Sequence, residues 1–258
     1  MLPIKMVDDD SREQPSLPHV LAVGWGLQSA PTRGPRPAMT AAGIVAAAVA
    51  IADADGVAAV SMANVAERLG FTTMSLYRYV SSKDDLLALM FDAAVGDAPK
   101  RGHRRGWRAG LRRWAEGLFA VYRLHPWALD IPITGPPALP NQLAWLDWGL
   151  AELEATTLEI GERLSVMLLL SGYVRSVATL TRDIAGGHQR AGSTPASVQA
   201  EYEALLGSLV TASRFPALHA AVHGGLFTDG DPDDLEFEFG LATILDGVDT
   251  LIRRRAPA

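Results

Sequence analysis

Serine, threonine and tyrosine hydroxyls, together with one lysine, lie between residues 61 and 83 of this 258-residue chain. Ser61 and Ser82 each stand where a serine can accept a hydrogen bond from the free amides that begin a helix. Such helix starts attract phosphate, and Lys83 adds a cation at the second of them. The side chains between them that can reach base edges or phosphates are Thr72, Thr73, Ser75, Tyr77 and Tyr79. This set indicates a surface that contacts nucleic acid.

The two tyrosines leave an alternative open, because they can equally be packing residues whose hydroxyls alone reach water. The position of Lys83 favours the functional interpretation. A cation at a helix N-terminus opposes the helix dipole by roughly a few tenths of a kcal/mol in an isolated helix. A phosphate partner would explain that local conflict.

Three short helices must position these groups. We expect Thr40 to cap a first helix that ends at Gly56, and Ser61 to cap a second that ends at Gly70 in a left-handed turn. A third helix over residues 72–80 follows at once, which makes a helix-turn-helix whose last helix can enter the major groove. The side chains expected to lock that recognition helix onto its supports are Phe71, Leu76 and Val80.

The rest of the chain also has helical periodicity, so we predict an all-α fold. Ser82 and Asp85 form a capping-box pattern ahead of a fourth helix that runs to about Val95. Further helices are expected over residues 107–124, 140–153, 158–184, 194–213 and 231–255. We divide the chain into a flexible, basic and proline-rich arm (1–38), a helix-turn-helix domain of three helices (39–97), and a helical bundle for ligand binding and dimerisation (98–258).

The charge distribution agrees with a DNA-binding N-terminal half. Residues 33–113 carry 12 Lys and Arg against 7 Asp and Glu, whereas residues 114–258 carry 9 against 18. Chance clustering on solvated faces is an equally good reading of the charges alone. The absence of cysteine and of a signal-peptide pattern predicts a cytoplasmic, nucleoid-associated protein, and the nearly apolar stretch from Leu164 to Val174 is short for a membrane span.

Enzyme chemistry has little support in the sequence. We find no nucleophile elbow, phosphate loop or dinucleotide fingerprint, and we expect no catalytic residue, cofactor or metal. His219 and His223 have the spacing of a zinc pair but lack a third ligand. The alternative to a regulator is an all-α small-molecule-binding protein or enzyme in which the helix-turn-helix is only structural.

Two expectations concern the bundle. Trp127 and Trp145 flank the proline-rich connection, where helix packing is interrupted, so we expect them to line a pocket for a flat apolar ligand together with Trp148 and Met167. We expect a homodimer whose seam combines the helix of residues 158–184 with the last helix. The seam residues expected on the last helix are Leu241, Leu245, Val248 and Ile252.

Residues 40–96, and above all the string TMSLYRYVSSKDDLLALM from Thr73 to Met90, resemble the DNA-binding domain of the TetR family of bacterial repressors. The resemblance implies that Thr73, Met74 and Tyr77 approach bases or adjacent phosphates. It implies that Ser61, Tyr79 and Lys83 hold the DNA backbone. Residues 33–37 look like the basic leader of a subset of the family, in which Arg36 would enter the minor groove.

The second half shows a weaker resemblance to the ligand-binding domain of the tetracycline-repressor subgroup, in His125-Pro126-Trp127, residues 134–137 and Asn141. The histidines that hold magnesium–tetracycline in that subgroup have no match here, so neither the metal nor the drug is carried over. The resemblance implies a homodimer that binds a palindromic operator in double-stranded DNA. We expect a small hydrophobic effector to release it.

Overall fold

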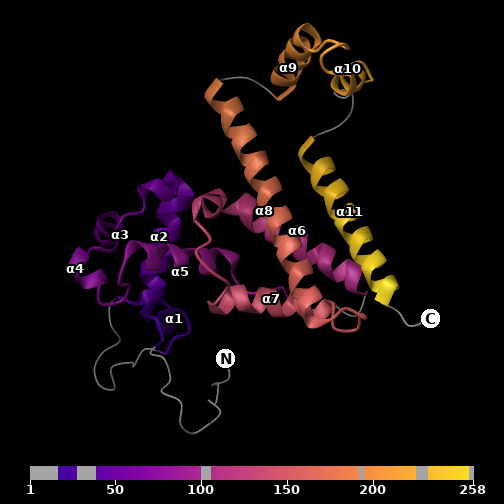
Figure 1. Cartoon of the computed structure of the whole chain (residues 1–258). Coiled ribbons are helices and arrows are strands. Elements are labelled where there is room, and N and C mark those ends of the chain that lie inside the picture. Colours follow the sequence, from indigo (N-terminus) through magenta and orange to yellow (C-terminus); the bar gives the residue numbers. More distant parts are fainter. Residues whose placement is uncertain (1–16, 28–38, 100–105, 192–194, 225–231, 256–258) are drawn as a thin grey trace.

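A computed structural model describes residues 17–27, 39–99, 106–191, 195–224 and 232–255 of the chain. Within these ranges the chain folds into helices, turns and loops without a strand, which confirms the all-α prediction. The helices form two groups, α1 to α5 on one side and α6 to α11 on the other (Figure 1).

The first supporting helices begin and end where the capping residues predict. They are α2 (Ala41–Asp55), η1 (Val57–Ala59) and α3 (Met62–Leu69). The Thr40 hydroxyl accepts from the Gly43 amide at 3.0 Å, and Gly56 ends α2 with a φ of 79°. Ile44, Ala48 and Val65 are fully buried between these helices, so the supports share one apolar core.

The recognition segment is shorter than the sequence suggests. Helix α4 (Thr73–Leu76) makes a single turn, and the chain continues in turns to Tyr79 before α5 (Lys83–Val95) begins. Leu76 and Val80 are fully buried as predicted, whereas Phe71 is exposed and does not lock the segment. Phe71 directly follows Gly70, where a φ of 73° turns the chain away from α3.

A helix that the sequence analysis missed precedes the helix-turn-helix. Helix α1 (His19–Gly24) packs Val20, Leu21 and Val23 against the core and lies along α5. The expectation of a flexible arm over residues 1–38 therefore does not hold for residues 17–27, which contain this packed helix. The prolines spread through this region hid the apolar run VLAVGW, which is long enough for one packed turn. The expected basic leader of residues 33–37, with Arg36, lies outside the described residues.

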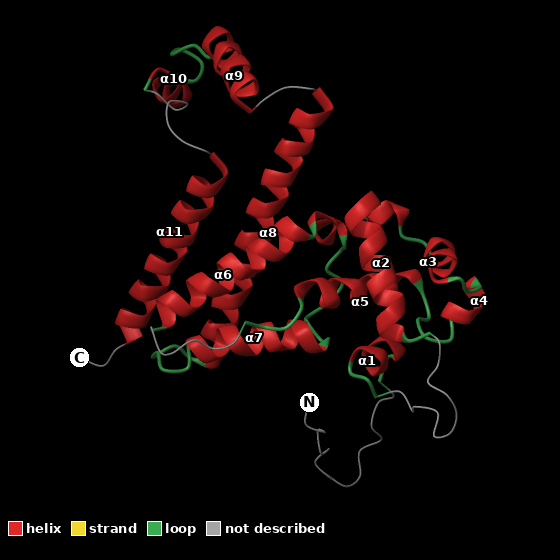
Figure 2. Cartoon of the chain, turned by 180° about the vertical axis from the view of Figure 1, so that it is seen from behind, coloured by secondary structure: helices red, strands yellow, loops and turns green. Residues whose placement is uncertain are grey.

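The second group is built around one long helix. Its elements are α6 (Trp107–Leu124), η2 (Pro126–Asp130), α7 (Pro140–Glu152), α8 (Ile160–Ala191), α9 (Pro195–Leu209), α10 (Pro216–His223) and α11 (Pro232–Arg255). Helix α8 packs against α6, α7 and α11, while α9 and α10 lie beyond the ends of α8 and α11 (Figure 2).

Two helix ends differ from the expected ones. Helix α8 passes through Gly186 and Gly187 instead of ending there, since a glycine inside a helix costs only about 1 kcal/mol relative to alanine. The helix expected over residues 194–213 ends at Leu209, and α10 begins separately at Pro216. By length and apolar composition alone, Ile160–Gly187 would be able to cross a membrane, unlike the shorter stretch considered from the sequence.

Candidate nucleic-acid interface and ligand pocket

Two serine caps frame the recognition segment. The Ser61 hydroxyl accepts from the Asn64 amide at 3.0 Å, and the Ser82 hydroxyl accepts from the Asp85 amide at 3.0 Å. These bonds fix where α3 and α5 begin, on either side of α4. Lys83 is exposed in the first turn of α5, so its ammonium is available to an anion.

The outward face of the recognition segment carries the side chains that the sequence singles out. Met74 is 77% exposed and Tyr77 47% exposed, and the Thr72 and Ser75 hydroxyls are 2.9 Å apart. Tyr79 differs from Tyr77 because it is half-buried and packs against the core. Tyr79 is therefore the kind of packing residue that the alternative describes, whereas Tyr77 is exposed on the surface.

A cation on this face escaped the sequence analysis. Arg78 follows Tyr77 in the same turn and is exposed. Arg68, in the last turn of α3, is exposed as well. The position of Arg78 between Tyr77 and Tyr79, in the string YRY, is the sequence signal for it. Arg78 can reach a phosphate as well as Lys83 can.

Helix α1 touches the turn that leads into α5. His19 Nδ1 lies 2.8 Å from the Ser81 hydroxyl, next to the Ser82 cap. At its other end, Trp25 donates its indole N–H to the Ala138 carbonyl at 3.0 Å. Helix α1 therefore joins the turn before α5 to the loop that precedes α7.

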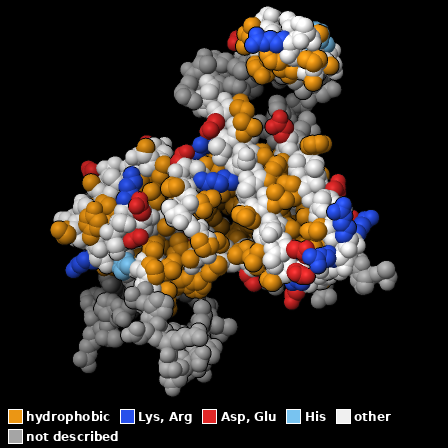
Figure 3. All heavy atoms as spheres, in the orientation of Figure 1, with side chains coloured by type: hydrophobic (Ala, Val, Ile, Leu, Met, Phe, Trp, Pro, Cys, Tyr) orange, Lys and Arg blue, Asp and Glu red, His pale blue; other side chains and the backbone are white. Residues whose placement is uncertain are grey.

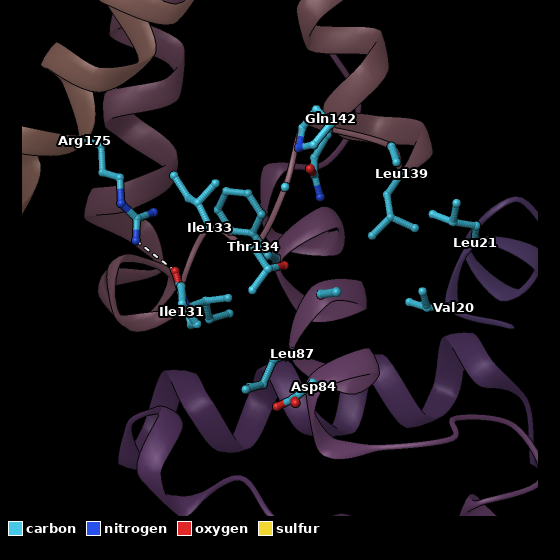
Figure 4. Close-up of a pocket in the computed structure, with 16 residues that line it drawn as sticks. Val20, Leu21, Asp84, Leu87, Ile131, Ile133, Thr134, Leu139, Gln142 and Arg175 are labelled. Atoms are coloured by element: carbon cyan, nitrogen blue, oxygen red, sulfur yellow. Dashed lines mark hydrogen bonds between the residues drawn. The ribbon is translucent and has the colours of Figure 1, made fainter. Parts of the chain in front are cut away.

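A pocket of about 350 Å³ opens between α1, α5, the loop before α7 and α8. Figure 3 shows hydrophobic side chains gathered around a hollow at this junction. The apolar lining includes Leu21, Leu87, Phe91, Ile131, Ile133 and Leu139, and the polar lining includes Asp84, Thr134, Gln142 and Arg175 (Figure 4). The mixture of apolar walls and few polar groups is typical of small-molecule sites.

The residues that the sequence analysis assigned to a pocket lie elsewhere. Trp127, Trp145, Trp148 and Met167 are all buried, and none of them lines this cavity. Each indole N–H is bonded within the protein: Trp127 to Asp53 Oδ1, Trp145 to the Gly96 carbonyl and Trp148 to Glu152 Oε1. Met167 packs onto Gly149, where no Cβ would fit. The aromatic rings fill the space between helices, as a packed core requires.

The expected seam residues are also placed differently. Leu241, Leu245 and Val248 are buried inside the protomer, and Ile252 packs against the same core. Helix α11 packs against α6 and α8 of its own chain, and Leu241, Leu245 and Val248 are used up by that contact, whereas Ile252 stays partly exposed. The stripe is apolar as predicted and packs within the protomer, because periodicity does not say what a face packs against.

Asp92 joins α5 to the start of α7. Its carboxylate accepts from the Gln142 amide at 3.0 Å and the Asn141 amide at 3.4 Å, while Asn141 Nδ2 donates to the Asp92 carbonyl at 2.9 Å. Burial raises the pKa of Asp92 above its ordinary value, against the lowering effect of the two amides. A side chain of α5 thus caps α7, whose first residues border the pocket.

Asp53 makes a second link between the two groups of helices. Asp53 Oδ1 lies 2.7 Å from His125 Nδ1 and accepts from the Trp127 indole at 2.6 Å. The contact joins the last turn of α2 to η2. In the described part of the chain, no three His, Cys, Asp or Glu side chains gather as metal ligands would.

Comparison with known proteins gives the family. Residues 44–90 match the model of bacterial regulatory proteins of the tetR family, and residues 98–252 match the tetracyclin repressor-like C-terminal domain. The chain is 35% identical over 233 residues to the HTH-type transcriptional repressor DrrR1 of Streptomyces coeruleorubidus, covering 90% of this chain and 85% of the relative. An HTH-type transcriptional regulator of Saccharopolyspora erythraea is 33% identical over 182 residues, covering 67% of this chain and 76% of its own.

Solved structures agree. Apo ActR from Streptomyces coelicolor superposes with a TM-score of 0.73 at 25% identity, covering 86% of this chain and all of ActR. ActR in complex with actinorhodin gives the same TM-score at 26% identity, over 86% of this chain and 100% of ActR. The chain belongs to the TetR family of bacterial transcriptional regulators.

Proposed function

We propose that this regulator is a homodimeric repressor that binds a palindromic operator through residues 61–83 and leaves it when a small molecule fills the pocket. The observation that carries the proposal is the position of α5. Its first turn carries Ser82 and Lys83 on the DNA side, and Leu87 and Phe91, farther along the same helix, line the pocket. A ligand that displaces α5 therefore moves the DNA-binding turn as well.

The ligand part of the proposal is supported by ActR, which has been solved with actinorhodin and with (S)-DNPA bound. Thermodynamic linkage makes the coupling between ligand binding and operator binding measurable. A ligand that weakens operator binding by a given factor must itself bind the operator-bound dimer more weakly by the same factor.

Individual DNA contacts are assigned by position on the recognition segment and at the two helix starts beside it. Thr73, Met74 and Tyr77 would approach base edges or adjacent phosphates, because they lie on the segment that enters the major groove. The phosphate-binding set would be Ser61, Thr72, Ser75, Tyr79 and Lys83, with Arg78 added from the structure. Arg36, in the leader before α2, stays in the proposal as a minor-groove contact.

The dimer part rests on an uncovered apolar face. In the most apolar 18-residue window of α8, only 28% of the residues are buried inside the protomer. Leu164, Leu168, Leu169 and Leu180 of α8 are exposed, and Leu168 reaches 74%. On α11, Phe239 is 77% exposed. Contiguous apolar surface of this kind marks an interface, and a second copy of α8 and α11 would cover it with a four-helix seam.

This arrangement makes the protein cytoplasmic and associated with the nucleoid, where its operator lies. The dimer must place its two recognition segments about one turn of DNA apart, roughly 34 to 36 Å. A modest change in that separation releases one half-site, and this is how the pocket would control the operator.

The test is operator selection from random duplex DNA at low salt, followed by affinity measurements on variants. Tyr77→Ala should weaken binding to the selected site more than binding to random duplex, since base contacts carry the specificity. Arg253→Ala is the matched control, because Arg253 is an exposed cation at the far end of α11. Failure to select any sequence, or a Tyr77→Ala protein that binds the selected site as tightly as the wild type, would contradict the proposal.

A further inference from the structure

Arg175 stands apart from the other residues of the pocket. Among the described residues that line the cavity, it alone carries a positive charge. Its Nη2 donates to the Leu129 carbonyl at 2.7 Å and to the Ile131 carbonyl at 2.9 Å. Figure 4 shows the guanidinium reaching the second of these carbonyls at the edge of the cavity.

The charge of Arg175 has no carboxylate partner within the described ranges. Its guanidinium carbon lies 5.9 Å from the centre of the Tyr122 ring, and its hydrogen-bond partners are the Tyr122 side chain and two neutral backbone carbonyls. Arg182, two turns along α8, differs because it pairs with Asp130 at 2.8 Å and with Asp183 at 2.9 Å. A half-buried cation without an anion carries an uncompensated desolvation cost, so an anionic ligand group would be stabilised beside it.

Asp84, the carboxylate that lines the pocket, does not pair with Arg175. Asp84 lies beside Leu87 on α5, across the cavity from Arg175, and is exposed to solvent (Figure 4). The hydrogen bonds to the two carbonyls use Nη2, and Arg175 also hydrogen-bonds with the Tyr122 side chain. Arginine has five N–H donors on three nitrogens, so these three bonds leave donors for a ligand.

The remaining walls define the body of that ligand. Leu21, Leu87, Phe91 and Ile133 offer apolar surface on several sides, and Thr134 and Gln142 can orient oxygen atoms. A cavity of about 350 Å³ suits a compact molecule of a few fused rings. Apolar walls with one unpaired cation select an aromatic acid.

We propose that Arg175 anchors the acidic group of an aromatic effector, a carboxylate, sulfonate or ionised phenol, whose rings lie between α5 and the loop before α7. This assignment rests on the proposed function, because it names the ligand class of the same pocket. Charge-assisted hydrogen bonds from arginine to such groups are strong and directional. Because Arg175 also holds the carbonyls of residues 129 and 131, an arriving anion is sensed by the loop that shapes the pocket.

The experiment uses two fluorescent probes of nearly the same shape. 1-Anilinonaphthalene-8-sulfonate carries a negative charge, and N-phenyl-1-naphthylamine lacks it. Arg175→Gln should weaken binding of the sulfonate by about tenfold or more, the loss expected for a hydrogen bond to a charged group. The neutral amine should bind within about twofold of the wild type, and Arg175→Lys should restore part of the sulfonate affinity.

Two further variants define the outcomes. Arg182→Gln removes a paired cation of the same helix and should leave both probes unchanged. Leu87→Trp fills the cavity and should weaken both. Equal loss of both probes in Arg175→Gln, or unchanged sulfonate binding, would overturn the anion anchor. Probe binding insensitive to Leu87→Trp would remove the pocket altogether, whereas operator binding, measured separately, would still decide whether the protein is a repressor.

Discussion

Replacing Asp92 by alanine tests the cap that α5 provides to α7. The side chain is only 6% exposed and accepts from the amides of Asn141 and Gln142, so its removal leaves two donors without their acceptor. Loss of a helix cap costs about 1 kcal/mol, and a buried unsatisfied donor costs about 1 to 3 kcal/mol. We expect Asp92→Ala to lower the free energy of unfolding by about 2 to 3 kcal/mol, which is a fall in Tm of roughly 4 to 12 °C for a chain of this size.

Asp92→Asn is the matched control, because the asparagine oxygen still accepts from Gln142 and carries no buried charge. Its loss should stay below about 1 kcal/mol. Burial raises the pKa of Asp92, so the folded state binds the proton more tightly than the unfolded state does. As the pH falls through this raised pKa toward 3.8, wild type should therefore gain stability relative to Asp92→Asn. Urea unfolding at several pH values measures the difference. A gain for the asparagine variant on acidification would refute the reasoning, since it would mean that the α7 amides outweigh burial.

Three further predictions concern the DNA contacts, the dimer seam on α8 and the left-handed turn at Gly70. Lys83→Ala should weaken binding about equally on operator and random duplex and lower the salt slope by about 1 for each bound protomer, whereas an unchanged slope would remove Lys83 from the phosphate contacts. Leu168→Asp should give monomers in sedimentation and abolish operator binding, because it puts a charge in the seam, and an intact dimer would exclude this face. Gly70→Ala should destabilise the protein by roughly 1 to 2 kcal/mol, since Gly70 is left-handed, and an unchanged Tm would contradict that reason.

Features determined by neighbouring residues could be predicted from the sequence. The caps at Thr40, Ser61 and Ser82 each bond an amide three residues ahead, and Gly70 ends α3 through its own backbone freedom. The helix-turn-helix depends on such local bonds. The outward position of Tyr77 followed once the buried Leu76 fixed the inner face, whereas Met74 was indicated only by the family resemblance.

Features determined by distant residues could not be predicted. The apolar stripe that contains Leu245 is plain in the sequence, but only the fold shows that it packs on its own protomer. The tryptophans are residues of a type common in ligand sites, but the fold places them in the packed core. Asp92 looks like one more acid on a helix until the fold brings Gln142 against it. Arg175 becomes notable only because no acid of the described ranges lies beside it. These assignments require contacts between residues about 40 or more positions apart, which periodicity does not encode.

The placement of α1 bears on how members of this family can be recombined. Chimeric regulators are made by joining the DNA-binding half of one protein to the sensing half of another at a single point in the chain. Here Val20 and Leu21 line the pocket, and Trp25 bonds to the loop at Ala138, although all three come before the helix-turn-helix. The residues that line the pocket are discontinuous in the chain. A fusion that exchanges everything before residue 98 would therefore replace part of the pocket wall along with the helix-turn-helix. A chimera that keeps its original pocket wall would need residues 17–27, together with the pocket-lining residues of α5, to travel with the second half.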